Sequence, residues 1–169
     1  EAALGRAFDD VDLLVPRERL PEVESHLMMG GWASTHHSAY DQRYYRDWMH
    51  ELPPMQHGSR QAVLDVHHAI LPLTARLKPD SRLLLAQARG LPDLPDWRVL
   101  APTDMVLHSM SHLFHNEELS HGLRDLSDLD LLLRQHGGEP GFWPTLQARA
   151  ELLDLRRPLH YGLQQTSAI

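Results

Sequence analysis

In the N-terminal part of the chain, apolar and polar positions follow mainly the two-residue period of β-strands. The run Val11–Val15 predicts a short buried strand that ends before a proline. Residues 62–71, AVLDVHHAIL, predict a second strand. Because side chains alternate between the two faces of a strand, Val63, Asp65 and His67 are expected on one face of it.

The segment between these two strands contains one helical pattern and one alternating pattern. Apolar residues recur at helical spacing from about Arg17 to Met29, and Gly30–Gly31 supplies a stop signal. Aromatic and polar residues alternate over 32–52, which predicts two antiparallel strands with a turn near residues 38–41. Pro53–Pro54 is expected to break this region.

Beyond residue 72 the period becomes helical. A helix is predicted from Asp80 or Ser81 to Gly90, followed by a proline-rich connector with a short strand at Trp97–Leu100 and a helix capped by Thr103. Further helices are predicted over 121–138, over 139–155 and beyond Arg156. The pattern indicates an α+β fold class, with a sheet-containing core over 1–72 and a C-terminal helical lobe with its connector over 73–169.

Composition narrows the classes of protein. The chain has 169 residues, a formal net charge of −7 and no cysteine, so disulfides and thiolate sites are excluded. The negative charge argues against a general nucleic-acid surface. No stretch approaches the roughly 20 apolar residues of a membrane span, and no signal pattern follows Glu1. We expect a cytoplasmic protein without a membrane segment, and a sequence that is a fragment of a longer one.

Three aspartates fall inside the apolar strand patterns. Asp10 and Asp12 are two positions apart and project from one side of the first strand, and Asp65 lies in the second. Buried carboxylates are costly unless they are paired or bind a cation, and oxygen ligands suit Mg²⁺ or Mn²⁺. Such a site can hold two ions roughly 3.5–4 Å apart for phosphoryl transfer. The alternative is that these aspartates cap loops at strand ends.

Three segments in this order resemble the nucleotidyltransferase superfamily, and more narrowly an uncharacterised bacterial branch of it. They are GRAFDDVDLLVPRERLPEVESHLMMGGW at 5–32, VLDVHHAIL at 63–71 and HLFHNEELSHGLRDLSDLDLLL at 112–133. The resemblance implies a nucleotidyltransferase-like mixed β-sheet core. It also implies that Asp10 and Asp12 bind the metal ions that carry a nucleoside triphosphate, and that Asp65 helps to activate an acceptor hydroxyl.

The resemblance also assigns residues to nucleotide binding. Gly5, Arg6 and His67 match positions of the branch, and Arg6 is expected to contact phosphate. Members of the superfamily carry a glycine-containing turn ahead of the D-x-D pair that cradles the phosphates. Here Gly5 stands without the preceding strand and helix. Either that part lies upstream of residue 1, or this form does not bind nucleotide as its relatives do.

The resemblance leaves the acceptor unknown. A small molecule similar to an antibiotic, a protein side chain and an RNA end are all conceivable, and RNA is the least favoured because of the acidic charge. Four aromatic residues could stack a nucleobase or simply pair across strands. They are Tyr40, Tyr44, Tyr45 and Trp48.

Two other functions remain open. One is a catalytically inactive binding or regulatory module that keeps the nucleotidyltransferase fold. The other is a metal-dependent phosphohydrolase, because His108, His112 and His115 share one face of a predicted helix, with Asp128 on the next helix. The competing interpretation is structural: we expect His112 to be largely buried and hydrogen-bonded to Asp128, tying the two helices together.

Overall fold

The computed structural model describes residues 10–115 and 122–168. These residues form two compact units, one up to residue 76 and one from residue 77 onward, and each unit is described by itself. No helix in the described ranges is both long enough and apolar enough to span a membrane. The combination of a mixed sheet with many helices confirms the predicted α+β class.

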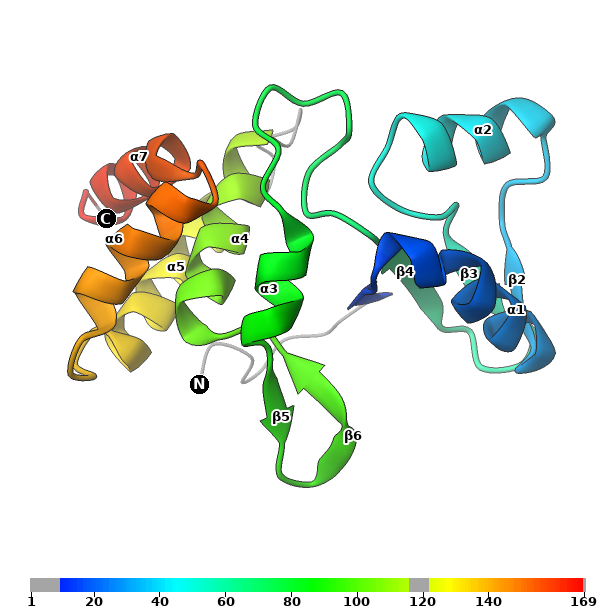
Figure 1. Ribbon diagram of the computed structural model, residues 1–169, viewed down its shortest axis with the longest axis horizontal. Helices are drawn as coiled ribbons and strands as arrows, with labels where there is room; N and C mark the ends of the chain where they lie inside the picture. Colours follow the sequence, from blue (N-terminus) through cyan, green and yellow to red (C-terminus); the bar gives the residue numbers. More distant parts are fainter. Residues whose placement is uncertain (1–9, 116–121, 169) are drawn as a thin grey trace. The chain divides into compact units, whose positions relative to one another are not determined.

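The first unit is built on a four-stranded mixed sheet (Figure 1). Its strands are β1 (Asp10–Leu14), β2 (Trp32–Ser34), β3 (Met55–His57) and β4 (Val63–His67). Their order in the sheet is β1-β4-β3-β2. Strand β1 runs parallel to β4, whereas β3 runs antiparallel to both β4 and β2. The two predicted strands that carry the aspartates are therefore direct neighbours.

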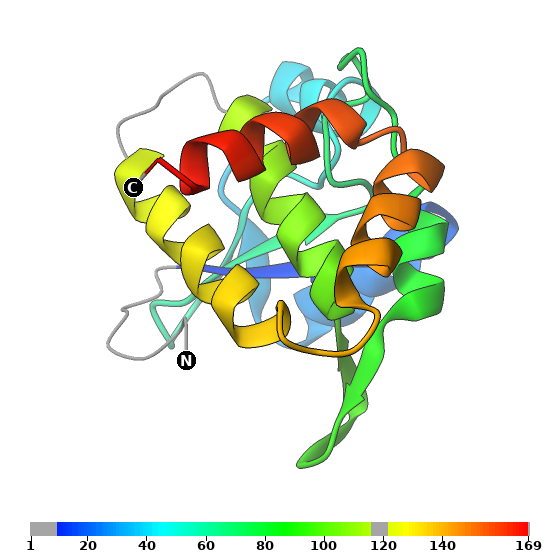
Figure 2. The ribbon, with the colours of Figure 1, turned by 90° about the vertical axis from the view of Figure 1, so that its left-hand side faces the viewer.

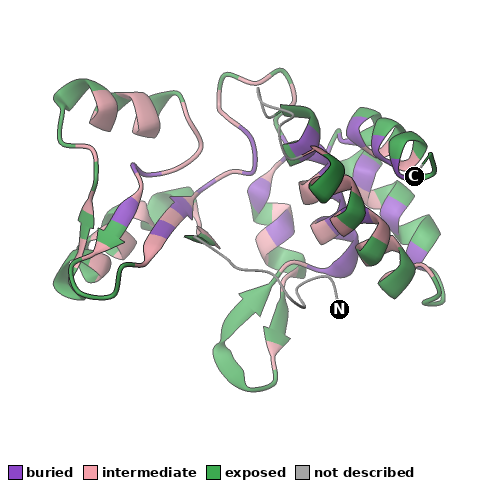
Figure 3. Cartoon of the chain, turned by 180° about the vertical axis from the view of Figure 1, so that it is seen from behind, coloured by how far each residue is buried: buried purple, intermediate pink, exposed green. Residues whose placement is uncertain are grey.

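One face of the sheet contains the apolar core of this unit. Leu64 and Val66 of β4 are buried there with Leu52, as the purple segments of β4 in Figure 3 indicate. Helix α1 (Leu20–Met29), which follows a short 3-10 turn at Arg17–Arg19, packs its apolar residues against this cluster. Because strand side chains alternate, the polar residues of β4 project from the opposite face.

The predicted pair of antiparallel strands over 32–52 is wrong. After β2, residues Ala39–Asp47 form helix α2. The Ser38 hydroxyl caps this helix by accepting a hydrogen bond from the Asp41 backbone N–H at 3.0 Å. Tyr44 contacts the rings of both Tyr40 and Trp48, four residues on either side, and this is the spacing of one helical face. Aromatic residues that alternate in sequence therefore follow a helical period here.

The second unit begins with helix α3 (Ser81–Gln87), which Asp80 caps as predicted. The helix ends before Gly90, and residues 89–91 and 94–99 form a hairpin of β5 (Arg89–Leu91) and β6 (Leu94–Val99). The short strand expected in the connector is therefore β6, and its partner β5 lies where the pattern predicted the last turn of a helix. Every residue of β6 is exposed, and the hairpin is green along most of its length in Figure 3.

Four helices complete this unit (Figure 2). They are α4 (Pro102–His115), α5 (Gly122–His136), α6 (Phe142–Leu152) and α7 (Arg156–Thr166). Helix α4 lies between α5 and α6, and α7 crosses it. The predicted Thr103 cap is wrong, because the helix begins at Pro102, whose fixed φ suits a first helical position. Gly162 lets α7 approach α4 closely, since an added Cβ would meet Met110 Cγ at 2.5 Å.

Candidate functional site

The register of the sheet brings the aspartates of β1 next to the aspartate of β4. Asp12 pairs with Asp65 across the parallel strands, and Asp10 pairs with Val63 two residues earlier. Paired residues of adjacent strands project from the same face. Asp10, Asp12 and Asp65 therefore lie on one face of neighbouring strands, opposite the apolar core that α1 covers.

The carboxylate of Asp65 lies in surroundings that disfavour its negative charge. Its Oδ1 atom is buried and has no hydrogen-bond partner in the described part of the chain. Burial, together with the negative charges of Asp12 and Asp10, raises the pKa of Asp65 above its usual value. A buried carboxylate oxygen with no partner and two negative neighbours is a position that a cation would stabilise.

His67 connects two carboxylates on this face. Its Nε2 lies 3.0 Å from Asp12 Oδ1 in a hydrogen bond, and its Nδ1 lies 3.2 Å from Glu51 Oε2. Burial alone lowers the pKa of His67, but the hydrogen bond to Asp12 and the charges of Glu51, Asp12 and Asp65 raise it overall. Only 18% of the His67 side chain is exposed, compared with 64% of the Asp12 side chain. The histidine is therefore held within the fold, whereas the carboxylate that it contacts faces solvent.

Glu51 is the functional candidate that sequence reasoning missed. Its side chain is only 16% exposed, and burial raises its pKa above the usual value, with Asp65 and Asp12 adding to the effect and His67 opposing it. Residue 51 forms an isolated antiparallel bridge with His67 just before the two prolines. The only signal in the sequence is a His-Glu pair ahead of a buried leucine, and nothing in it reveals the pairing with β4.

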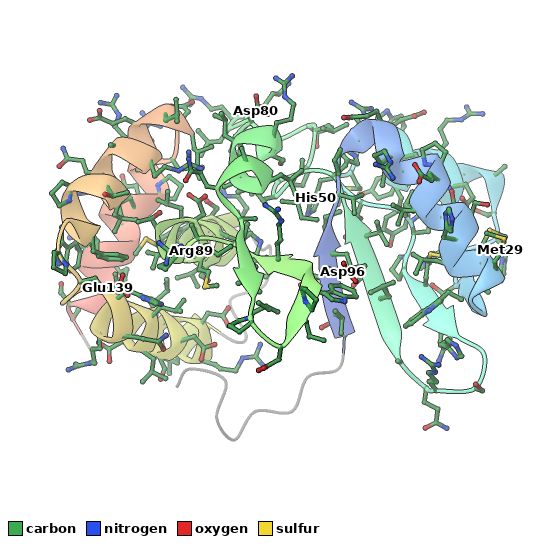
Figure 4. All side chains as sticks on the ribbon, turned by 60° about the horizontal axis from the view of Figure 1, so that its bottom comes forward. Met29, His50, Asp80, Arg89, Asp96 and Glu139 are labelled. Atoms are coloured by element: carbon green, nitrogen blue, oxygen red, sulfur yellow. The ribbon has the colours of Figure 1, made fainter. Side chains whose placement is uncertain are left out.

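His50 joins the same cluster through the backbone of its segment. Its carbonyl oxygen accepts hydrogen bonds from the backbone N–H groups of His68 at 2.8 Å and Ala69 at 3.3 Å. Its ring centroid lies 5.0 Å from that of His67, and Figure 4 labels its position in the sheet-containing unit. Ligand atoms of His50, Glu51 and His67 all lie within 4.8 Å of one another, and no other trio of His, Cys, Asp or Glu does so among the described residues.

The other predicted site residues fall elsewhere. Gly5 and Arg6 lie outside the described residues. The prediction that His112 is largely buried is wrong, because the outward face of α4 leaves its side chain exposed, while the half-buried Asp128 lies on α5. The predicted aromatic set lies on and just after α2 rather than on paired strands.

A second buried carboxylate in the molecule provides a contrast. Asp104 of α4 has no exposed side-chain surface, and Arg149 of α6 donates two hydrogen bonds to it, at 2.9 and 2.8 Å. Arg149 also donates to the Leu83 carbonyl oxygen at 3.2 Å. This carboxylate is fully paired, so it ties helices together and leaves no capacity for a ligand.

One of two comparisons places the chain among known proteins. The family described as "Uncharacterised nucleotidyltransferase" matches residues 1–169. The chain belongs to this family. A search of curated proteins found no match. Family membership indicates nucleotidyl transfer as the reaction class.

Proposed function

We propose that this nucleotidyltransferase moves a nucleotidyl group from a nucleoside triphosphate to a hydroxyl acceptor, with pyrophosphate leaving. The reaction would take place on the polar face of the sheet. The observation that carries the proposal is the in-register pairing of Asp12 with Asp65 on parallel strands. Family membership supports the reaction class, and the order of the sequence motifs supports the roles of the residues.

The residues on this face fit a hard divalent cation, Mg²⁺ or Mn²⁺. The fit rests on the buried Asp65 oxygen that lacks a hydrogen-bond partner in the described ranges, and on the neighbouring carboxylates that raise the pKa of Asp65. Asp10, Asp12 and Asp65 would hold the metal through oxygen ligands, which both ions prefer. When bound, the metal supplies positive charge that offsets the charge of the triphosphate.

The protein's own groups would orient the reactants and take up one proton. In this proposal Asp65 accepts the proton of the acceptor hydroxyl as the new P–O bond forms and the bond to the leaving pyrophosphate breaks. His67 donates a hydrogen bond to Asp12 and so fixes the direction of a carboxylate that is otherwise largely exposed. Glu51 contacts the opposite nitrogen of the His67 ring, Nδ1.

The proposal leaves the class of acceptor open between a small molecule and a protein side chain. A nucleic-acid acceptor is disfavoured by the net charge of −7. The cytoplasm, where triphosphates and magnesium are abundant, is the proposed compartment. The competing function is a binding module that takes up the triphosphate on the same face without turnover. In the described part of the helical unit, no His/Asp trio brings its ligand atoms together to support a phosphohydrolase.

The test is a thermal-shift screen of nucleoside triphosphates with and without Mg²⁺, followed by turnover measurements with candidate hydroxyl acceptors. A triphosphate at 100 times its dissociation constant should stabilise the protein by about 2.7 kcal/mol, and only when Mg²⁺ is present. Asp12→Asn should abolish this stabilisation. Asp65→Asn should lower turnover by roughly 10²–10⁴-fold and affect nucleotide affinity much less.

Asp47→Asn is the matched control, because Asp47 is an exposed aspartate at the end of α2 in the same unit. It should behave like the wild type. Magnesium-dependent stabilisation without turnover on any acceptor would favour the binding module. No stabilisation by any triphosphate would contradict both functions.

A further inference from the structure

We propose that His50, Glu51 and His67 form a binding site for one divalent transition ion of the zinc class, separate from the aspartates assigned to the triphosphate. Each residue offers one ligand atom, and these three atoms lie within 4.8 Å of one another. Two imidazole nitrogens and one carboxylate oxygen are a donor set that favours Zn²⁺ or Co²⁺, whereas Mg²⁺ favours oxygen alone. The proposal does not depend on nucleotidyl transfer.

The distances are close to those that such an ion requires. Donors at about 2.1 Å from a tetrahedral ion lie roughly 3.4 Å from one another. Glu51 Oε2 and His67 Nδ1 are already 3.2 Å apart. The His50 ligand atom lies within 4.8 Å of the ligand atoms of Glu51 and His67, so in this proposal a side-chain rotation of His50 completes the set. Three protein donors would leave one coordination position open.

The backbone holds the three residues in place. His67 lies at the end of the central strand β4, and Glu51 forms a bridge with it. Hydrogen bonds on both sides fix the segment, from the Leu52 N–H to the Val66 carbonyl oxygen at 2.8 Å and from the His68 N–H to the His50 carbonyl oxygen at 2.8 Å. Figure 4 labels His50 in this segment. The donors therefore project from rigid backbone, as a defined metal site requires.

The second nitrogen of His67 provides an independent sign of a metal ligand. Histidines that bind metals usually donate their other ring N–H to a carboxylate, which fixes the tautomer and the direction of the ring. His67 Nε2 makes this hydrogen bond with Asp12 Oδ1 at 3.0 Å, and the other ring nitrogen, Nδ1, lies 3.2 Å from Glu51 Oε2. Through His67, an ion at this site would also orient Asp12, the carboxylate that faces the triphosphate in the proposed reaction.

The experiment is a titration of the metal-free full chain with Co²⁺, followed by visible absorption and by displacement with Zn²⁺. We expect one Co²⁺ per chain with the intense absorption of a four-coordinate ion. His50→Gln and Glu51→Gln should each remove a ligand and weaken binding by more than the roughly 10–100-fold that loss of an outer partner costs. Asp12→Asn should weaken it by that outer-partner amount, about 10–100-fold.

Two control variants separate this site from other metal sites. His37→Gln removes an exposed histidine of the same unit and should leave Co²⁺ affinity unchanged. Asp10→Asn should also leave it unchanged while it weakens magnesium-dependent triphosphate binding, so failure of this proposal and failure of the proposed function can be told apart. Circular dichroism melts confirm the fold of each variant, and Glu51→Asp, which retains a carboxylate, replaces Glu51→Gln if the latter is unfolded.

Several results would overturn the proposal. One is a wild-type chain that does not bind Co²⁺. Another is a bound ion with the weak spectrum of a six-coordinate oxygen site. The third is a His50→Gln variant that binds Co²⁺ as the wild type does, while Asp10→Asn does not, which would place the ion among the aspartates.

Discussion

Each of the two units has a carboxylate with a buried oxygen, and the hydrogen bonding of these two carboxylates differs. In the helical unit, Asp104 receives two hydrogen bonds from Arg149 and has no exposed surface. In the sheet-containing unit, Asp65 keeps one buried oxygen without a hydrogen-bond partner among the described residues, and negatively charged neighbours raise its pKa further. The Asp104 carboxylate is hydrogen-bonded within the fold, whereas one oxygen of Asp65 lacks a hydrogen-bond partner among the described residues.

Under the proposed function, this difference separates a structural charge, Asp104, from a functional one, Asp65. A paired buried charge holds its surroundings together, and its loss is felt mainly as lost stability. An unsatisfied one costs stability, and a chain retains such a group where it contributes to binding or catalysis. Loss of the charge partner of Asp104 and loss of the charge of Asp65 should therefore change stability in opposite directions. Three measurements test this contrast, and a fourth concerns the exposed histidine of α4.

The largest effect is expected in the helical unit. Arg149→Leu leaves Asp104 buried and unpaired, and should lower the free energy of unfolding by about 3–5 kcal/mol in urea denaturation. The double variant Asp104→Leu/Arg149→Leu should recover most of that loss, because no uncompensated charge remains. Arg157→Leu, at an exposed arginine of α7, is the control. A loss below about 1 kcal/mol for Arg149→Leu would show that water satisfies Asp104 instead.

The opposite sign is expected at Asp65. In the metal-free protein, Asp65→Asn removes a charge that burial and the carboxylates of Asp12 and Asp10 disfavour. The free energy of unfolding should rise by roughly 0.5–2 kcal/mol, while turnover is lost, as is common for active-site residues. Urea denaturation in the presence of a chelator measures the change in unfolding free energy. Asp47→Asn should leave stability unchanged, and a clear loss of stability in Asp65→Asn would mean that its carboxylate is structural.

The pH dependence of the free energy of unfolding tests the Asp65 carboxyl separately. The pKa of Asp65 is higher in the folded chain than its usual 3.8, so its contribution to stability is complete below that value and is lost as the pH rises through the folded pKa. The metal-free wild type should therefore lose stability relative to Asp65→Asn as the pH rises from about 4 through the folded pKa of Asp65. Unfolding free energies of both proteins across this range measure the difference. A constant difference would show that the pKa of Asp65 is the same in the folded and unfolded chains.

The smallest effect is expected at His112. Its side chain is exposed on α4, so His112→Ala should change the free energy of unfolding by less than about 0.5 kcal/mol, as exposed substitutions generally do. Thermal unfolding with and without added Zn²⁺ checks both structural and metal-binding roles. A loss of 1 kcal/mol or more, or a zinc-dependent stabilisation that the variant abolishes, would restore the helical histidines as candidates.

Local pattern was sufficient for much of the fold. Strands β1 and β4, helix α1 and the helices after residue 102 follow from apolar periodicity and from stop signals such as Gly137–Gly138, because burial of one face requires that spacing. The predictions from the pattern were wrong at α2, which was expected to be strand, and at β5, which was expected to be helix. In α2 a serine cap and aromatic contacts four residues apart outweighed the strand propensity of aromatic residues. In β5 a short hairpin replaced the last turn expected of α3.

The candidate site divides in the same way. The sequence by itself determined that Asp10 and Asp12 share a face of one strand and that Asp65 and His67 share a face of another, because side chains alternate along any strand. Only the tertiary structure decided that the two strands are parallel neighbours with Asp12 opposite Asp65, and that Glu51 reaches His67 from a segment broken by two prolines. Periodicity sets the direction of a side chain within its own element. Its partners on other elements depend on register, which is set by the packing of the whole sheet.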